Sequence, residues 1–155
     1  MKTFSRSLIK PALLVFILFI FSCGPLIATF DQASYQHVTS LKVDALALMD
    51  KCKEDYSLHT KEVADFQLDM DKAIEYDKHR PNNGITSKQW EILNDPDGHL
   101  LGAFWILWRR DKVLDTIAKK MGTSYFPAKK KQISEAFDQI AELESGKLKP
   151  KQVTN

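Results

Sequence analysis

The sequence predicts an all-α fold, in which a long N-terminal helix packs against shorter C-terminal helices as a helical hairpin or small bundle. Residues 31–80 contain no Gly and no Pro, and their apolar residues recur at alternating three- and four-residue spacing, which is typical of a helix with one apolar stripe. Residues 127–146 repeat this spacing near the C-terminus. No segment alternates with period two for long enough to predict a strand.

The stretch 31–80 is expected to organise the rest of the chain. Asp31 or Ser34 can cap its start. If continuous, the helix would reach roughly 70 Å at about 1.5 Å per residue. The alternative is a break at residues 57–60, where Ser and Thr can cap a restarted helix. With Lys42 and His59 filling two gaps, the apolar stripe consists of Tyr35, Val38, Ala45, Met49, Cys52, Tyr56, Val63, Phe66, Met70 and Ala73.

Shorter elements are expected between residues 81 and 122. Pro81 and the Asn-Asn-Gly that follows it end the long stretch. Thr86 or Ser87 can cap a short helix that continues through Leu93. Residues 99–108 are apolar on nearly every side, which indicates a helix buried centrally or in contact with lipid. Residues 113–121 are expected to form a further short helix.

The last helix is expected to begin around Pro127 and to end before Gly146, over about 20 residues and roughly 30 Å. It is too short to cover all of a continuous 31–80 helix. An apolar stripe would therefore stay uncovered, and exposed stripes of this kind often bind other molecules.

The N-terminal segment has the features of a signal peptide. Lys2, Arg6 and Lys10 are basic, no acidic residue accompanies them, and residues 12–21 form an uninterrupted apolar run. This run is shorter than the roughly 20 residues that a membrane-spanning helix needs.

Ile20, Phe21, Ser22 and Cys23 follow directly. They resemble the lipobox of bacterial lipoproteins, although a small residue is usual where Phe21 stands. The resemblance covers residues 1–23 only and implies that the signal is removed before Cys23, whose sulfur then carries a diacylglyceryl group. Gly24 favours the outer over the inner membrane by the same analogy. A plain secretory signal and a membrane helix extending through Ile27 are the alternatives.

The predicted organisation is a signal peptide at 1–22, a lipidated tether at 23–30, a single helical domain at 31–146 and a flexible tail at 147–155. The mature chain would have 133 of the 155 residues and a net charge of −1, because the signal holds three basic residues and no acidic one. This charge gives no reason to expect nucleic-acid binding. Cys52 would have no intramolecular cysteine partner and is expected in the core.

The basic stretch at residues 109–131 follows the tryptophan-rich segment and holds eight basic residues against two acidic ones. One interpretation is contact with a membrane or an acidic partner. The other is that these charges face water or complement the acidic 31–80 stretch. The candidate contact residues are Trp105, Trp108, Arg109, Arg110, Lys129, Lys130 and Lys131.

Few residues point to chemistry. The sequence has no nucleophile elbow, no phosphate-binding glycine loop and no Cys-x-x-Cys, so catalytic, cofactor and metal sites are not predicted. His59, with Asp55 and Glu62 nearby, is the best single ligand candidate. Residues 95–98 are interpreted as a turn whose Asp side chains cap the next helix, and not as a calcium loop.

These observations together predict a membrane-anchored envelope lipoprotein that binds a protein partner, self-associates or has a structural role. The alternative is a bundle that binds a small ligand or a metal in its core.

Overall fold

The described part of the computed structural model, residues 28–114 and 124–146, is helical and contains no strand. The predicted all-α fold is confirmed. The helices are α2 (Gln32–Asp50), α3 (Thr60–Lys78), α4 (Gly84–Asn94), α5 (Leu101–Asp111) and α7 (Tyr125–Glu144), with short 3₁₀ turns η1 (Lys51–Lys53) and η2 (Tyr56–Leu58). The signal peptide, Cys23 and the tail at 147–155 lie outside the described residues.

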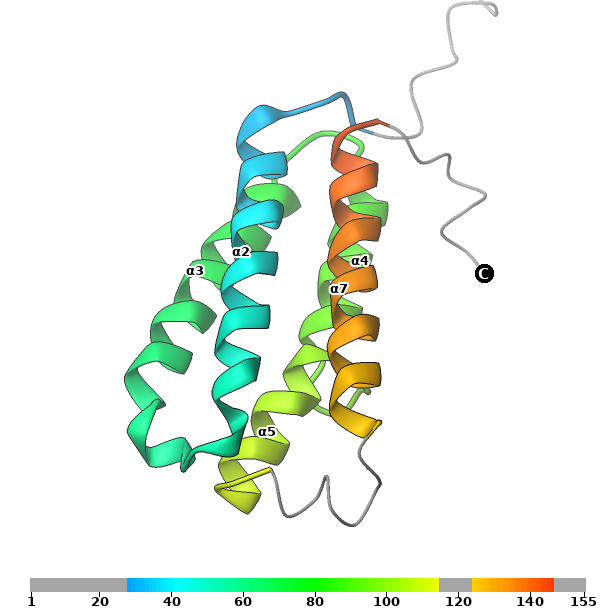
Figure 1. The fold of residues 1–155 in the computed structure, drawn as a ribbon. Helices are drawn as coiled ribbons and strands as arrows, with labels where there is room; N and C mark the ends of the chain where they lie inside the picture. Colours follow the sequence, from blue (N-terminus) through cyan, green and yellow to red (C-terminus); the bar gives the residue numbers. More distant parts are fainter. Residues whose placement is uncertain (1–27, 115–123, 147–155) are drawn as a thin grey trace, which may run out of the picture.

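The helices form a small bundle in which α2 packs against both α3 and α7, and α4 packs against α7 and α3 (Figure 1). The start of α2, the end of α3 and the end of α7 lie together at the upper end of Figure 1. The turns η1 and η2 lie at the lower end, close to α5. These two ends are called the upper end and the lower end below.

Residues 31–80 form two helices, so the continuous helix is wrong and the alternative, a helix restarted near residues 57–60, agrees with the start of α3 at Thr60. The chain turns back between Asp50 and Thr60, so α2 and α3 form an antiparallel hairpin (Figure 1). The backbone groups that leave the helical pattern there find partners far along the chain. The Tyr56 amide donates to the Lys112 carbonyl at 2.8 Å, and the Leu114 amide donates to the Cys52 carbonyl at 3.0 Å. These bonds compensate for the interrupted helix.

The predicted apolar stripe forms much of the core despite this break. Most of its residues are buried, and the exceptions are Tyr35, which is exposed, and Tyr56, which is partly buried. Ile133, Phe137 and Ile140 of α7 are fully buried in the same cluster. The prediction of an uncovered stripe is therefore wrong, because α2 and α3 fold back and turn their stripes toward one shared core. The buried stripe residues are Val38, Ala45, Met49, Cys52, Val63, Phe66, Met70 and Ala73.

The helix boundaries agree with several of the predicted caps. Asp31 caps α2 by accepting a hydrogen bond from the Ser34 amide at 2.9 Å. Gly146, with φ of +71°, lies just beyond α7, as a C-terminal glycine commonly does. Pro127 lies in the first turn of α7.

Two boundaries differ from the prediction. Helix α4 begins at Gly84, before the expected caps Thr86 and Ser87. Val113 and Leu114 are not helical, and the rest of the helix expected at 113–121 lies outside the described residues.

Gly102 marks a close approach between α5 and the end of α4. A Cβ atom at this position would lie 2.3 Å from the Asn94 carbonyl oxygen and 2.6 Å from the Asp95 carbonyl carbon. Both neighbours are backbone atoms, which cannot move aside as a flexible side chain could. The tight turn between α4 and α5 therefore depends on the absence of a side chain here.

We expect Gly102→Ala to destabilise the protein by about 1–3 kcal/mol through this overlap, although alanine favours helix more than glycine does. Urea denaturation followed by circular dichroism measures the change. Gly84→Ala is the matched control, because a Cβ at Gly84 meets nothing within 4 Å. Equal stability of the two variants would contradict the close approach.

Candidate functional site

A cluster of buried polar side chains joins four helices at the upper end of the bundle. We call it the Arg80 cluster, and define it as Ser34, Asp77, Arg80, Asn83, Thr86, Trp90 and Glu144. Asp77 and Glu144 are almost fully buried, and the Arg80 side chain is only 11% exposed. Burying charged groups is unfavourable unless they are paired and hydrogen-bonded, so their partners decide whether the cluster is stable.

Arg80 is the centre of the cluster. Its guanidinium donates to Glu144, to the Ser34 hydroxyl at 2.8 Å and to the Thr29 carbonyl at 2.7 Å. An Asp77 carboxylate oxygen lies 3.6 Å from the same guanidinium. One side chain therefore connects the start of α2, the end of α3, the end of α7 and the segment that precedes α2.

The two carboxylates have further donors. Asp77 accepts from the Trp90 indole at 2.7 Å and from the Ser34 hydroxyl. Glu144 accepts from the Thr86 hydroxyl at 2.8 Å. Asp77 thus connects α3 to α2 and α4, and Glu144 connects the end of α7 to α4 and to Arg80, which lies just after α3.

The ionisation of the cluster follows from its burial. Burial raises the pKa of Glu144 above its ordinary value, and the hydrogen bonds from Arg80 and Thr86 only partly oppose this effect. Burial also acts to lower the pKa of Arg80, but the hydrogen bond and charge of Glu144, with Asp31 and Asp77, raise it overall. Arg80 therefore stays charged and supports the charged form of Glu144.

Little in the sequence indicates this cluster. Asp77 and Arg80 are three residues apart in the sequence, at the end of the stretch predicted to be helical, and this spacing indicates a possible pair. Glu144 is 64 residues further along, and nothing in the local pattern around it distinguishes it from the exposed acidic residues of α7.

Trp105 and Trp108 are core residues, so their proposed role in surface contact is wrong. Trp108 is fully buried and its indole donates to the Glu54 carbonyl at 3.1 Å. It packs against Tyr56 and His59, with ring centroids 5.4 and 5.5 Å away. Trp105 packs edge-on against Phe66 of α3 at 5.6 Å. Helix α5 is therefore buried centrally, which is one of the two positions predicted for the apolar residues 99–108.

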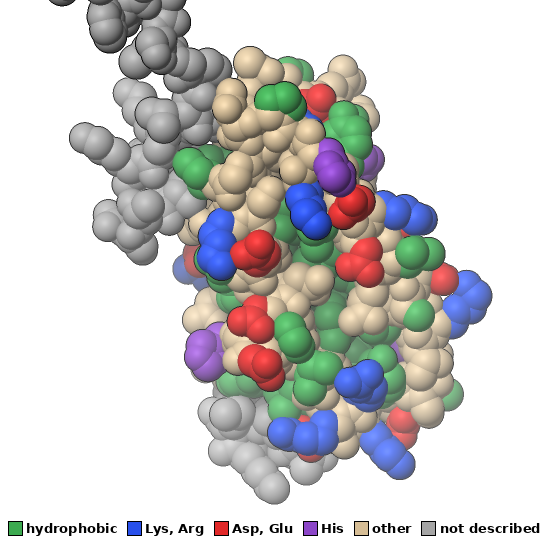
Figure 2. Space-filling view, turned by 180° about the vertical axis from the view of Figure 1, so that it is seen from behind, with side chains coloured by type: hydrophobic (Ala, Val, Ile, Leu, Met, Phe, Trp, Pro, Cys, Tyr) green, Lys and Arg blue, Asp and Glu red, His purple; other side chains and the backbone are tan. Residues whose placement is uncertain are grey.

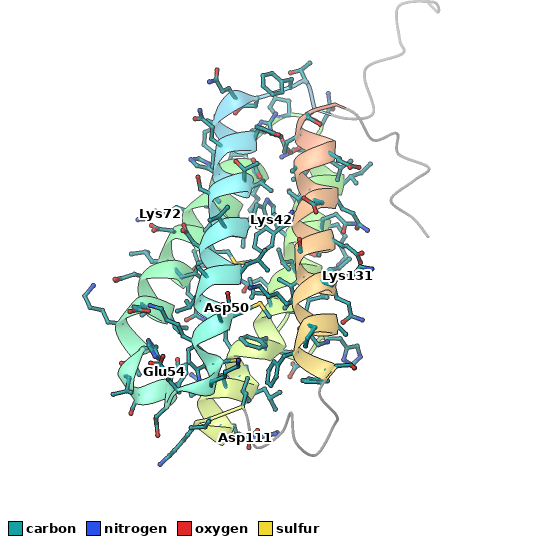
Figure 3. The ribbon with its side chains drawn as sticks, in the orientation of Figure 1. Lys42, Asp50, Glu54, Lys72, Asp111 and Lys131 are labelled. Atoms are coloured by element: carbon teal, nitrogen blue, oxygen red, sulfur yellow. The ribbon has the colours of Figure 1, made fainter. Side chains whose placement is uncertain are left out.

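The predicted basic contact residues are spread over the bundle surface. Arg109 and Arg110 are exposed at the end of α5, and Arg110 pairs with Asp111. Lys129 donates to the His99 carbonyl at 2.8 Å. Lys130 pairs with Asp50 at 2.6 Å, and Lys131 lies 3.7 Å from Glu135. Figure 3 labels Asp50 on α2 and Lys131 on α7. Much of this positive charge is thus matched within the described bundle.

His59 lies at the lower end, where it precedes α3. Its Nε2 is 2.8 Å from a Glu54 carboxylate oxygen, and its Nδ1 is 3.4 Å from Glu62. Asp55 does not contribute here, because its carboxylate accepts from the Ser57 amide. No group of three metal-ligating side chains is found among the described residues.

The positions of Cys52 and Asp95 test two further predictions from the sequence. Cys52 is buried at the lower end, as predicted. Asp95 accepts from the Asp97 amide at 2.9 Å, which confirms the turn. Helix α5, however, begins after Leu100 and has no side-chain cap, so the predicted capping role is wrong.

Comparisons with protein-family models, with curated proteins and with solved structures found no match to this chain. Among the described helices, none is both long and apolar enough to cross a membrane.

A surface groove lies between α3 and α4. It has a volume of about 500 Å³, and its apolar lining includes Ile74 and Ile92. Figure 2 shows hydrophobic side chains along the middle of this face, with charged side chains around them. The charged lining consists of three acidic residues, Asp71, Glu91 and Asp95, and one basic residue, Lys88.

Proposed function

We propose that this protein is a lipid-anchored, non-enzymatic protein of the bacterial cell envelope that binds a protein partner. The observation that carries the proposal is the sequence Ile20, Phe21, Ser22 and Cys23, which resembles a lipobox and stands shortly before the bundle. By the same resemblance, Gly24 favours the outer membrane.

The short distance between the proposed anchor and the bundle supports this proposal. Helix α2 begins at Gln32, and Arg80 already holds the chain at Thr29. A lipid on Cys23 would therefore keep the bundle close to a membrane surface. Two or three acyl chains on one cysteine give a stable anchor, where one chain would not.

The burial of the Arg80 cluster supports a structural role for its charges. Asp77 and Glu144 are almost fully buried and accept hydrogen bonds from groups within the bundle. The rival proposal is a small-ligand or metal site in the core. The α7 residues Ile133, Phe137 and Ile140 are fully buried there, and their apolar side chains supply no ligating group.

The groove between α3 and α4 is the surface that we assign to the partner. Ile92 is exposed on its edge, and acidic side chains outnumber basic ones around it. The expected partner therefore has an apolar segment that fits the groove and basic residues that face the acidic side chains around it. A second copy of this chain is the alternative partner.

Metabolic labelling with a palmitate analogue tests the anchor. We expect the native chain to carry the label and the Cys23→Ala variant to lose it, because the lipid would be attached through the sulfur of Cys23. Cys52→Ala is the matched control, since Cys52 is buried within the bundle. Label absent from the native chain, or kept by Cys23→Ala, would contradict the proposed anchor.

A photocrosslinking amino acid in place of Ile92 tests the groove. We expect a protein adduct that decreases severalfold when Glu91 and Asp95 are changed to Lys, because the partner is expected to be basic. The same probe in place of Val43, exposed on α2, is the control. Equal adducts from the two positions would contradict a specific groove, and an adduct of twice the chain mass would identify self-association.

A further inference from the structure

Three aromatic side chains are exposed at the upper end of the bundle, beside the segment that leads back to Cys23. Phe30 is 59% exposed, Tyr35 is 37% exposed and Tyr76 is 41% exposed. Phe30 precedes α2, Tyr35 lies in its first turn, and Tyr76 lies in the last turn of α3. The upper end thus carries aromatic rings on two different helices.

Phe30 and Tyr35 contact each other directly, and Asp31 links them to Tyr76. The Phe30 and Tyr35 ring centroids are 6.4 Å apart. The Tyr76 hydroxyl lies 3.3 Å from both carboxylate oxygens of Asp31, the residue that separates Phe30 from α2. His37 packs edge-on against Tyr76 at 5.5 Å. We call Phe30, Tyr35 and Tyr76 the aromatic end.

The length of chain outside the bundle limits how far this end can be from an anchored lipid. The Arg80 guanidinium holds the carbonyl of Thr29, and five residues separate Thr29 from Cys23. Fully extended, that stretch reaches about 20 Å at about 3.5 Å per residue. A lipid on Cys23 therefore brings the aromatic end, and not the lower end, next to the membrane.

The chemistry of this end suits the headgroup region of a bilayer. Tyrosine rings prefer this region because one part of the ring is apolar and the hydroxyl is polar. The neighbouring charges on α3 are of both signs: Lys72 and Lys78 alternate with Asp71 and Glu75. Lys72 pairs with Asp69, and Lys78 lies 4.0 Å from Glu75, so the contact does not need anionic lipids.

We infer that the aromatic end rests on the phospholipid surface of the membrane that holds the Cys23 lipid. The inference deepens the proposed function and rests on its anchor. It sets the orientation of the protein: α2 and α3 point away from the membrane, and η2 with Leu58 lies at the far end. The α3/α4 groove then stays open to a partner along the side of the bundle.

The test is photocrosslinking in bacterial cells with the full chain. A benzophenone amino acid replaces Tyr76, which lies on a different helix from the tether, and in a second variant replaces Leu58, which is 71% exposed at the lower end. Mass spectrometry identifies the adducts, and palmitate-analogue labelling of the same samples reports the anchor. We expect a phospholipid adduct at position 76 that is severalfold more abundant than at position 58.

Each other outcome contradicts either the membrane contact or the lipid anchor. Palmitate label without a phospholipid adduct at position 76, or with equal adducts at both positions, refutes the membrane contact and leaves the anchor standing. A protein adduct at position 76 assigns this end to a protein. Absence of the palmitate label refutes the proposed anchor, and the membrane contact with it.

Discussion

Replacing Arg80 with methionine is expected to destabilise the protein by about 3–5 kcal/mol, because two buried carboxylates would lose their cation. Glu144 and Asp77 both lie against the guanidinium, and both are almost fully buried. Methionine keeps most of the aliphatic stem of the side chain, so the loss comes mainly from the missing charge and its hydrogen bonds. Urea denaturation at pH 7 measures the change.

Two controls separate this effect from the loss of any positive charge on α3. Lys78→Met removes an exposed charge two residues away and is expected to cost less than about 1 kcal/mol. Adding Glu144→Gln to Arg80→Met is expected to restore part of the lost stability, since the unpaired carboxylate is then removed. Equal effects of Arg80→Met and Lys78→Met would contradict the cluster.

The pH dependence of the Arg80→Met variant gives a second readout. Burial already raises the pKa of Glu144 above its ordinary value, and removal of Arg80 is expected to raise it further. Between the unfolded and the folded pKa, the native state then binds more protons, so its stability increases as the pH falls. The deficit relative to the native chain is therefore expected to shrink between pH 7 and about pH 5.

Trp108→Ala is expected to destabilise the protein by about 3–5 kcal/mol, as truncation of a fully buried tryptophan does. The change would open a cavity beside Tyr56 and His59. It would also leave the Glu54 carbonyl without the indole donor. Urea denaturation followed by circular dichroism measures the loss.

Two further variants make the Trp108 result specific. Trp108→Phe keeps a ring in the core and is expected to lose less stability than Trp108→Ala. Ile106→Ala, on the exposed side of the same helix, is expected to lose less than about 1 kcal/mol. If Trp108→Ala instead kept its stability and reduced binding to lipid vesicles, a surface position for Trp108 would be supported.

The break in the 31–80 stretch shows how tertiary contacts override a local pattern. No Gly or Pro marks the turn between α2 and α3, and the alternating spacing continues across it. The decisive partners are the backbone groups of Lys112 and Leu114, more than fifty residues away. A sequence pattern records which residues face the core, but it does not record whether that core lies along one rod or between two helices.

Some buried positions could likewise be predicted from the sequence, whereas the candidate site could not. The burial of Cys52, Ile133 and Phe137 follows from helical spacing alone. The Arg80 cluster and the aromatic end each need residues from different helices to meet. Asp77 with Glu144, and Tyr76 with Asp31, come together only when the chain folds back on itself.

Local periodicity and composition were therefore sufficient for the helical class, for most core positions and for the expectation of a lipidated N-terminus, which stays a prediction. The hairpin, the burial of the two tryptophans and the charged cluster required the folded chain. The physical reason is the range of the interactions. Apolar spacing along one helix is a local property, whereas the pairing of a buried charge depends on side chains that approach from elsewhere in the sequence.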